Sequence, residues 1–369
     1  MHAIWKIKRE LNRLAHKPRN LLDLLAGPSM QKYMDRAAGS IVQRGKAGRF
    51  PDIALLLLYA PEGVPEDYDR MLDYLESQEV ARVVIAHSPL TDEDRARLLA
   101  KSHLLIERPN FGYDFGGYRA GVMTLLDLGY DLCNLFIMND SIWFPLHSDC
   151  DLIEAARKDQ SDLYGIYMNH RPKSPHRSHL QSYFYRFGPR ITKHDDLELF
   201  WRSLITYNNK DLTVRRNEMK LTHWFQERGY CIGYRYDISD LQNALLNLNL
   251  AQRNAVAAYQ IMIGDKHGDY VQRQLACDAY ENYDKYKADV KAGILGRYFM
   301  ITHPTVLIDH LRCPVLKRDK RYPYQVQRAV LLSECYSQEL PETLIADIAG
   351  RTDIEGLKRK AAQIAFAPT

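Results

Sequence analysis

Apolar runs of strand length alternate with stretches of helical periodicity over the first half of the chain. Near-continuous apolar runs occupy 52–59, 80–86, 103–106, 135–138 and 163–168. Strands buried on both faces of a parallel sheet have this character. Helical segments fall between them, at 65–78, from Thr91-Asp92-Glu93-Asp94 onward, and at 118–128. The alternation predicts a three-layer α/β domain with ligands at the carboxyl ends of its strands.

The second half of the chain has mainly helical spacing. The segments concerned are 214–228, which ends at Gly229-Tyr230, then 241–298, 325–338 and 341–349. The domains we expect are a basic amphipathic helix and linker at 1–49, an α/β core at 50–240, a helical insertion on the acceptor side at 241–300, and a C-terminal helical segment at 301–369 that completes the core.

Composition excludes several classes of protein. The 369 residues are 46% hydrophobic and 26% charged, which is ordinary for a globular protein. Fifty Lys and Arg against 46 Asp and Glu leave +4, too small a surplus to indicate a nucleic-acid partner. The longest apolar run, 53–60, is far shorter than the roughly twenty residues of a membrane span. Six scattered cysteines and the lack of a signal-peptide pattern favour the cytoplasm.

Residues 1–20 carry six cations and one acid. Ile4, Trp5, Ile7, Leu11 and Leu14 fall largely on one side at helical spacing. Such a helix can lie on an anionic membrane surface, which would make the protein peripheral at the inner face of the plasma membrane. It can equally dock on its own protein. The sequence leaves both open, and glycines in 37–49 suggest a linker after it.

A glycine-rich stretch follows the third predicted strand. Asn110, Gly112, Asp114 and Gly116 lie in it. Glycines allow close approach of a ligand, and Asp114 can accept hydrogen bonds from a sugar or ribose. Neither GxGxxG nor GxxxxGK[ST] is present, which disfavours a dinucleotide fold and a phosphate loop. A tight turn with Asp114 as helix cap is the alternative.

The fourth predicted strand ends in Met138-Asn139-Asp140-Ser141. A carboxylate just past a central apolar strand is well placed for a divalent cation that carries phosphate oxygens. A helix or turn cap is the competing interpretation of Asp140.

Two further polar groups are candidates. The loop 169–179 is basic, and could clamp phosphate or be merely solvated; His179 and Gln181 lie where it meets an aromatic stretch ending at Phe184. Glu218 lies on a helical segment, where it could be a general base or a surface residue.

Together these motifs resemble the rhamnan synthesis protein F family, bacterial glycosyltransferases of cell-surface polysaccharide assembly. Those that carry the resemblance are Asn110-x-Gly112-x-Asp114-x-Gly116, Met138-Asn139-Asp140-Ser141, His179-Leu180-Gln181-Ser182-Tyr183-Phe184, Glu218 with Leu221-Thr222, and the late His303-Pro304-Thr305 and Cys313-Pro314-Val315-Leu316-Lys317-Arg318. The resemblance covers about 52–322. Tyr113 departs from the Arg that family members commonly have before the Asp.

The resemblance implies a GT-A-like nucleotide-binding fold and metal-assisted transfer of a sugar, with rhamnose as a candidate, from a nucleoside-diphosphate sugar to a glycan or lipid-linked acceptor such as lipopolysaccharide. It implies Asp140 as ligand of Mg²⁺ or Mn²⁺. Donor contacts are expected from Tyr59, Ala60, Asn110, Gly112, Asp114, Gly116, Asn139, His179 and Gln181. Glu218 is the first candidate for the base, with Asp195 and Asp196 next. A non-catalytic carbohydrate-binding or assembly protein of the same fold is the alternative.

Overall fold

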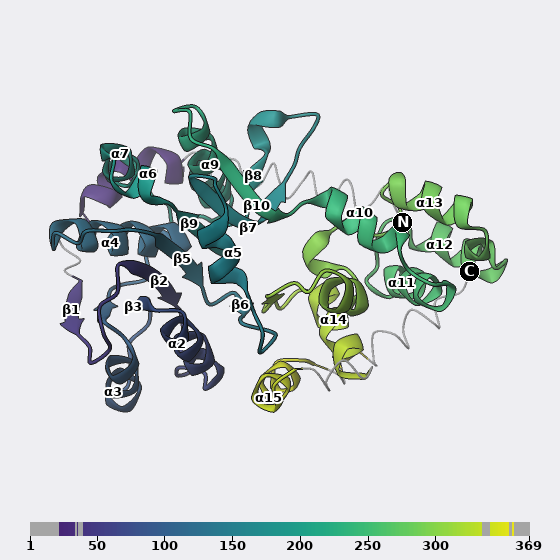
Figure 1. Cartoon of the computed structure of the whole chain (residues 1–369), viewed down its shortest axis with the longest axis horizontal. Coiled ribbons are helices and arrows are strands. Elements are labelled where there is room, and N and C mark those ends of the chain that lie inside the picture. Colours follow the sequence, from purple (N-terminus) through teal and green to yellow (C-terminus); the bar gives the residue numbers. More distant parts are fainter. Residues whose placement is uncertain (1–21, 34, 36–39, 334–339, 354–355, 358–369) are drawn as a thin grey trace. The chain divides into compact units, whose positions relative to one another are not determined.

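The computed structural model describes residues 22–33, 35, 40–333, 340–353 and 356–357. The predicted basic helix at 1–20 lies outside these residues. The chain forms two compact units, one of residues 1–140 and 153–235 and the other of 141–152 and 236–369 (Figure 1). The division therefore falls at 235/236 rather than at 240, and the segments 241–300 and 301–369 belong to one unit.

The first unit is built on a mixed sheet in the order β1-β4-β3-β2-β5-β9-β7-β10, with β8 paired to β7. β2, β3, β4 and β5 run parallel, while β9 is antiparallel to both β5 and β7. The strands are β1 (Ile41–Arg44), β2 (Asp52–Leu58), β3 (Val80–Ala86), β4 (Leu104–Glu107), β5 (Leu135–Asn139), β7 (Leu163–Asn169), β8 (His179–Leu180), β9 (Phe184–Phe187) and β10 (Ile232–Tyr236). The five predicted strands are confirmed.

Helices cover both faces of this sheet. They are α2 (Asp67–Ser77), α3 (Asp92–Lys101), α4 (Tyr113–Asp127), α5 (Leu152–Lys158), α6 (Pro189–Thr192), α7 (Asp195–Ser203), α8 (Lys210–Thr213) and α9 (Met219–Gln226). Alternate β2 residues such as Leu55 and Leu57 pack with α4, α7 and α9 in one hydrophobic core. Figure 1 shows α2 and α3 on the other side of the sheet from α7. This arrangement confirms the predicted α/β fold class.

The helix predicted at 118–128 begins earlier, because α4 starts at Tyr113 and takes in part of the glycine-rich stretch. Its glycines let the helix approach the sheet. A Cβ on Gly117 would lie 2.2 Å from Leu57 Cδ1, and one on Gly116 would lie 1.9 Å from the Phe111 carbonyl oxygen. Gly112 is the N-cap, with a left-handed φ of 84°. The glycines therefore serve helix packing.

The described part of the predicted linker, residues 40–49, is also structured. Residues 22–33 are helical, and β1 pairs with β4 at the edge of the sheet. A Cβ on Gly45 would lie 2.0 Å from the Ser102 carbonyl oxygen, so this glycine makes a close backbone contact rather than a flexible joint.

The second unit is mainly helical. It holds a two-stranded ribbon of β6 (Ile142–Trp143) and β11 (Leu316–Lys317). Its main helices are α10 (Ile238–Leu246), α11 (Leu250–Met262), α12 (Gly268–Ala276), α13 (Tyr283–Lys291), α14 (Tyr322–Ser333) and α15 (Glu342–Gly350). The predicted helical segments 241–298 and 341–349 are thus confirmed, and 325–338 is confirmed as far as residue 333, the last one described there. No helix in the described ranges is both long and apolar enough to cross a bilayer.

Candidate active site

Asp140 lies at the carboxyl edge of the parallel strands. It follows β5, whose residues Leu135–Asn139 are all buried, so the chain emerges from the sheet at this point. The backbone N–H of Tyr59, just past the end of the neighbouring β2, donates to Asp140 Oδ2 at 2.6 Å. The structure therefore brings Tyr59 and Asp140 together across two adjacent strands, with the Tyr59 side chain 52% exposed.

Asn139 joins Asp140 to the start of α4. Its Nδ2 donates to Asp114 Oδ2 at 3.0 Å, which holds the first turn of the helix over the end of β5. One turn along α4, the hydroxyl of buried Tyr118 donates to the Ser182 carbonyl at 2.9 Å. Burial raises the pKa of Tyr118 well above its ordinary value, and the charges of Asp114 and Asp140 raise it further. Tyr118 is therefore a neutral hydroxyl beside these carboxylates.

Glu218 meets the same edge from a different element. It ends a π-helical turn, Val214–Glu218, that leads into α9. The Ser182 N–H donates to Glu218 Oε1 at 3.0 Å, and His179 Nε2 lies 3.9 Å from that oxygen. Burial raises the pKa of Tyr185, to which the charges of Glu218 and then Asp114 add. Both carboxylates thus act on one buried phenol, within one polar network.

Of the remaining predicted donor contacts, two lie near the carboxyl edge of the sheet and two are glycines that pack within the fold. Ala60 is near the edge, since its N–H donates to Ser88 Oγ at 3.0 Å, and the Gln181 N–H is bonded to the Tyr167 carbonyl. The N–H of Gly112 donates to Asn208 Oδ1 at 2.9 Å, and Gly112 and Gly116 pack closely. The backbone of these two glycines therefore serves the fold, and a donor contact through them stays a prediction.

Asn110 borders a cation–imidazole pair. Arg108 Nη1 lies 2.8 Å from His87 Nε2, and Arg108 also donates to the Phe111 carbonyl. Burial first, and then the Arg108 charge, lower the pKa of His87 to about 3, against a smaller raising effect from the Asn110 side chain. His87 is therefore neutral at pH 7 and accepts from Arg108.

Asp195 and Asp196 lie away from this site. Strand β9 runs antiparallel to β5, with Phe184 opposite Met138 and Phe187 opposite Leu135. The chain therefore reaches α6 and α7 at the amino edge of the sheet. There Asp196 accepts from the Tyr230 hydroxyl and pairs with Arg228. Asp195 and Asp196 therefore lie at the opposite edge of the sheet from Asp140, and Glu218 stays the first candidate for the base.

Several residues of the site were not predicted. The hydroxyls of Tyr118 and Tyr185 donate to the Ser182 and Leu180 carbonyls, and half-buried Arg108 contacts buried His87 beside Asn110. His87 directly follows β3, as Tyr59 follows β2 and Asp140 follows β5. The same rule of polar residues at strand ends that selected Asp140 could have found it.

The residues present fit a cation that arrives with a diphosphate better than a preformed metal cage. Among the described residues, no group of three or more His, Cys, Asp or Glu could hold a metal. Asp140 is a partly exposed carboxylate, steadied by the Tyr59 N–H. Mg²⁺ commonly takes only one or two protein carboxylates and completes its shell with substrate phosphates and water.

Comparison with known proteins agrees with this architecture. Residues 82–268 match the family described as rhamnan synthesis protein F. Protein y4gN of Sinorhizobium fredii is 33% identical over 345 residues, which cover 91% of this chain and 88% of the relative. The chain belongs to the rhamnan synthesis protein F family.

Similar folds occur among solved structures of transferases. One protein, from Desulfovibrio desulfuricans, is assigned as a nucleotide-diphospho-sugar transferase; the similarity has a TM-score of 0.36 and 12% identity, over 51% of this chain and 81% of that one. The mannosyltransferase PcManGT of Pyrobaculum calidifontis, solved with GDP-Man and Mn²⁺, gives 0.32 and 14%, over 57% and 61%. Likenesses at this level carry no functional weight.

Proposed function

We propose that this protein is a nucleotide-sugar-dependent glycosyltransferase, a hexosyltransferase with rhamnose as its first candidate sugar. The acceptor is a polysaccharide or lipopolysaccharide. The observation that carries the proposal is the Asp140 carboxylate, bonded to the Tyr59 N–H at 2.6 Å where two adjacent parallel strands end. Ligands of α/β domains bind at this edge. Membership of the rhamnan synthesis protein F family supports the same conclusion.

The donor lies, in this proposal, along the ends of β2 and β5. Tyr59 offers an exposed aromatic ring to the base, beside Ala60. Asp114 and Asn139, already bonded to each other, face the ribose or the donor sugar. His179 and Gln181 are further candidate contacts.

Asp140 would hold a Mg²⁺ or Mn²⁺ ion together with the diphosphate oxygens of the donor. When bound, such an ion neutralises the negative charge that grows on the departing diphosphate. The Tyr59 N–H fixes the orientation of the carboxylate.

Glu218 would remove the proton from the acceptor hydroxyl in an inverting transfer. Its Oε1 accepts from the Ser182 N–H, which orients the carboxylate. The Tyr118 hydroxyl holds the Ser182 carbonyl, so the same short segment connects the base to α4 and its Asp114.

Binding of nucleotide sugars tests this function directly. The full chain is titrated with a panel of nucleoside-diphosphate sugars, with and without Mn²⁺, and thermal unfolding is followed. A donor at about 100 times its dissociation constant should stabilise the protein by about 2.7 kcal/mol. If no nucleotide sugar shifts the transition but a free glycan does, a carbohydrate-binding protein of the same fold is the better description.

We also propose that the protein works at the cytoplasmic face of the membrane, with residues 1–20 on anionic lipid. The support is the sequence alone: Lys6, Lys8, Arg9, Arg13, Lys17 and Arg19 against Glu10.

A further inference from the structure

The helix over residues 22–33 packs on the first unit with its polar side. Asp23, Gly27 and Gln31 are spaced four residues apart, so they share one face of the helix, and Asp35 continues that spacing. Soluble helices ordinarily turn an apolar stripe toward the protein and polar residues toward water. In this helix the polar residues Asp23 and Gln31 face the protein instead.

Each position on the inner face has a defined contact. Asn209 Nδ2 donates to Asp23 Oδ2 at 2.7 Å. Gln31 Oε1 accepts from both the N–H and the hydroxyl of Thr206, at 3.2 and 2.5 Å. A Cβ on Gly27 would lie 2.5 Å from the Tyr207 ring, so the helix approaches the chain closely there.

Asp35 extends this attachment to α4. Both its carboxylate oxygens accept from Arg119, at 2.6 and 3.1 Å, and its Oδ1 also accepts from Gln31 Nε2. These contacts fix the rotation of the helix about its own axis. The side that faces away from the protein is therefore defined by geometry.

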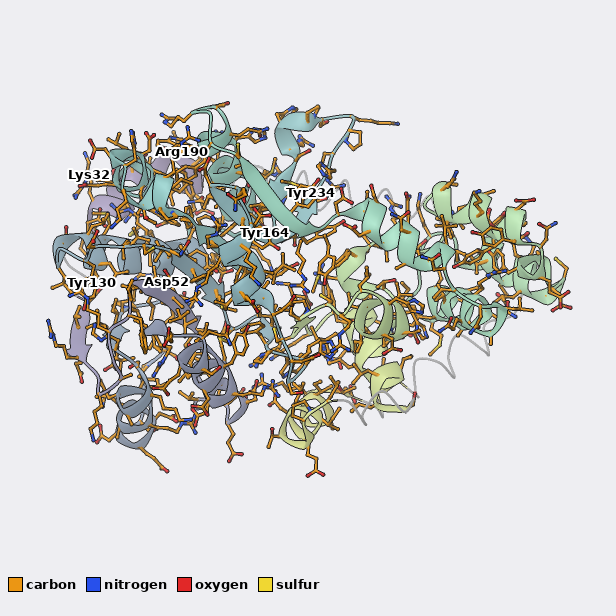
Figure 2. The ribbon with its side chains drawn as sticks, viewed as in Figure 1. Lys32, Asp52, Tyr130, Tyr164, Arg190 and Tyr234 are labelled. Carbon is orange, nitrogen blue, oxygen red and sulfur yellow. The ribbon has the colours of Figure 1, made fainter. Side chains whose placement is uncertain are left out.

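Large apolar side chains are exposed on this helix. Leu22, Leu25 and Tyr33 are 67%, 68% and 63% exposed, and Met30 is exposed as well. At 3.6 residues per turn Leu22, Leu25 and Tyr33 lie on the side opposite Gly27, together with Ser29, whereas Met30, seven residues after Asp23, falls at the border of the inner face. Exposed Lys32 lies at the edge of the stripe, on the same helix, where Figure 2 labels it.

We propose that the stripe of Leu22, Leu25 and Tyr33 inserts into the interface of an anionic lipid membrane. The positive charge near the stripe favours an anionic membrane as its partner. The twenty residues that lead into the helix carry a net of five positive charges, and Lys32 adds another beside the stripe. Apolar side chains flanked by cations are the pattern of helices that lie in a membrane surface. Each cation near anionic lipid adds attraction that salt screens.

The test uses the full chain and sedimentation with vesicles at low salt. One set of vesicles consists of phosphatidylcholine alone. In the other set, phosphatidylglycerol, an anionic lipid, makes up about one third of the lipid. The double variant Leu22→Gln/Leu25→Gln removes the stripe. Leu128→Gln, at an exposed leucine that caps the far end of α4, is the matched control.

We expect wild type to sediment with the anionic vesicles only and to be released by salt. The double variant should bind at least about tenfold more weakly, because two leucines lose their burial in lipid. Leu128→Gln should bind as wild type does. All three proteins should unfold at the same temperature without vesicles, since these side chains are exposed, and should bind nucleotide sugars equally.

Three results would overturn the proposal. Wild type that stays in the supernatant removes the membrane as partner. A double variant with a lowered unfolding temperature shows that the chain itself covers the stripe. A wild-type dimer that the double variant dissociates shows that a second copy does. Failure of nucleotide-sugar binding in wild type would instead count against the proposed activity and leave this surface untouched.

Discussion

Tyr113 has a backbone conformation that costs free energy. Its φ of 50° directly follows the φ of 84° at Gly112, and such angles are unfavourable for a residue with a bulky side chain. The neighbouring chain maintains them. Asn208 accepts from the Gly112 N–H, and a Cβ at 112 would lie 2.6 Å from Thr206 Oγ1. The ring is 42% exposed beside Asp114, so the strain lies at the proposed donor site.

At position 113 glycine should therefore stabilise the fold relative to alanine. We expect the free energy of unfolding of Tyr113→Gly to be about 1 kcal/mol higher than that of Tyr113→Ala, because only glycine accepts this φ without cost. In an ordinary helix position the alanine variant would be the more stable one. Urea unfolding of the two variants measures the difference. An alanine variant as stable as the glycine variant would mean that the backbone is not strained in solution.

His87 should make the protein less stable in mild acid. Its pKa is about 3 in the folded protein and ordinarily 6.5, so the unfolded chain binds a proton between those values that the folded one does not. Stability is then complete above pH 6.5 and falls as the pH drops toward 3.

Between pH 7 and pH 5 this group should account for about 2 kcal/mol. Urea unfolding at the two pH values, for wild type and His87→Gln, isolates the contribution. The variant should be less stable at pH 7 but lose less stability in acid. Equal losses in the two proteins would show that His87 is protonated in the folded state.

At the scale of elements, the contact of α4 with the sheet decides where the candidate site lies. Gly117 is the closest point, with Leu57 and His87 filling the space that a Cβ would take. Gly117→Ala should cost about 1–3 kcal/mol of stability, as overpacking in a core does, and should lower donor affinity because Asp114 lies on the same helix. Gly350→Ala, at the end of α15 with open space around it, is the control and should be nearly neutral.

A small effect of Gly117→Ala, close to that of Gly350→Ala, would contradict this packing. Thermal unfolding and donor titration of both variants give the two readouts.

The sequence predicted the strands and their polar ends because both depend on local pattern. Near-continuous apolar runs identified β2, β3 and β5, and Asp140 followed from its place after one of them. The glycines of α4 were interpreted wrongly because their reason, the closeness of Leu57 and Phe111, is a tertiary contact. Asp195 was grouped with the site because nothing local in the sequence shows that β9 runs antiparallel.

On the scale of the whole molecule, the candidate site residues lie in the first unit. Asp140 ends its first segment, and Glu218 lies in its second, 153–235. The membrane stripe of residues 22–33 belongs to the same unit. Catalysis and membrane attachment are thus proposed for one folded body, and they can be tested by separate variants.

The central claim concerns the charge of Asp140, and Asp140→Asn tests it most directly. Asparagine keeps an oxygen for the Tyr59 N–H, so the fold should lose no more than a few tenths of a kcal/mol, as when Asn replaces Asp at a cap. Asp195→Asn, at the opposite edge of the sheet, is the control. Sugar transfer by Asp140→Asn should fall by about 10²–10³ and Mn²⁺ should no longer raise donor affinity, while Asp195→Asn keeps the wild-type rate. Transfer by Asp140→Asn at the wild-type rate, or wild-type activity that survives full chelation, would contradict the account.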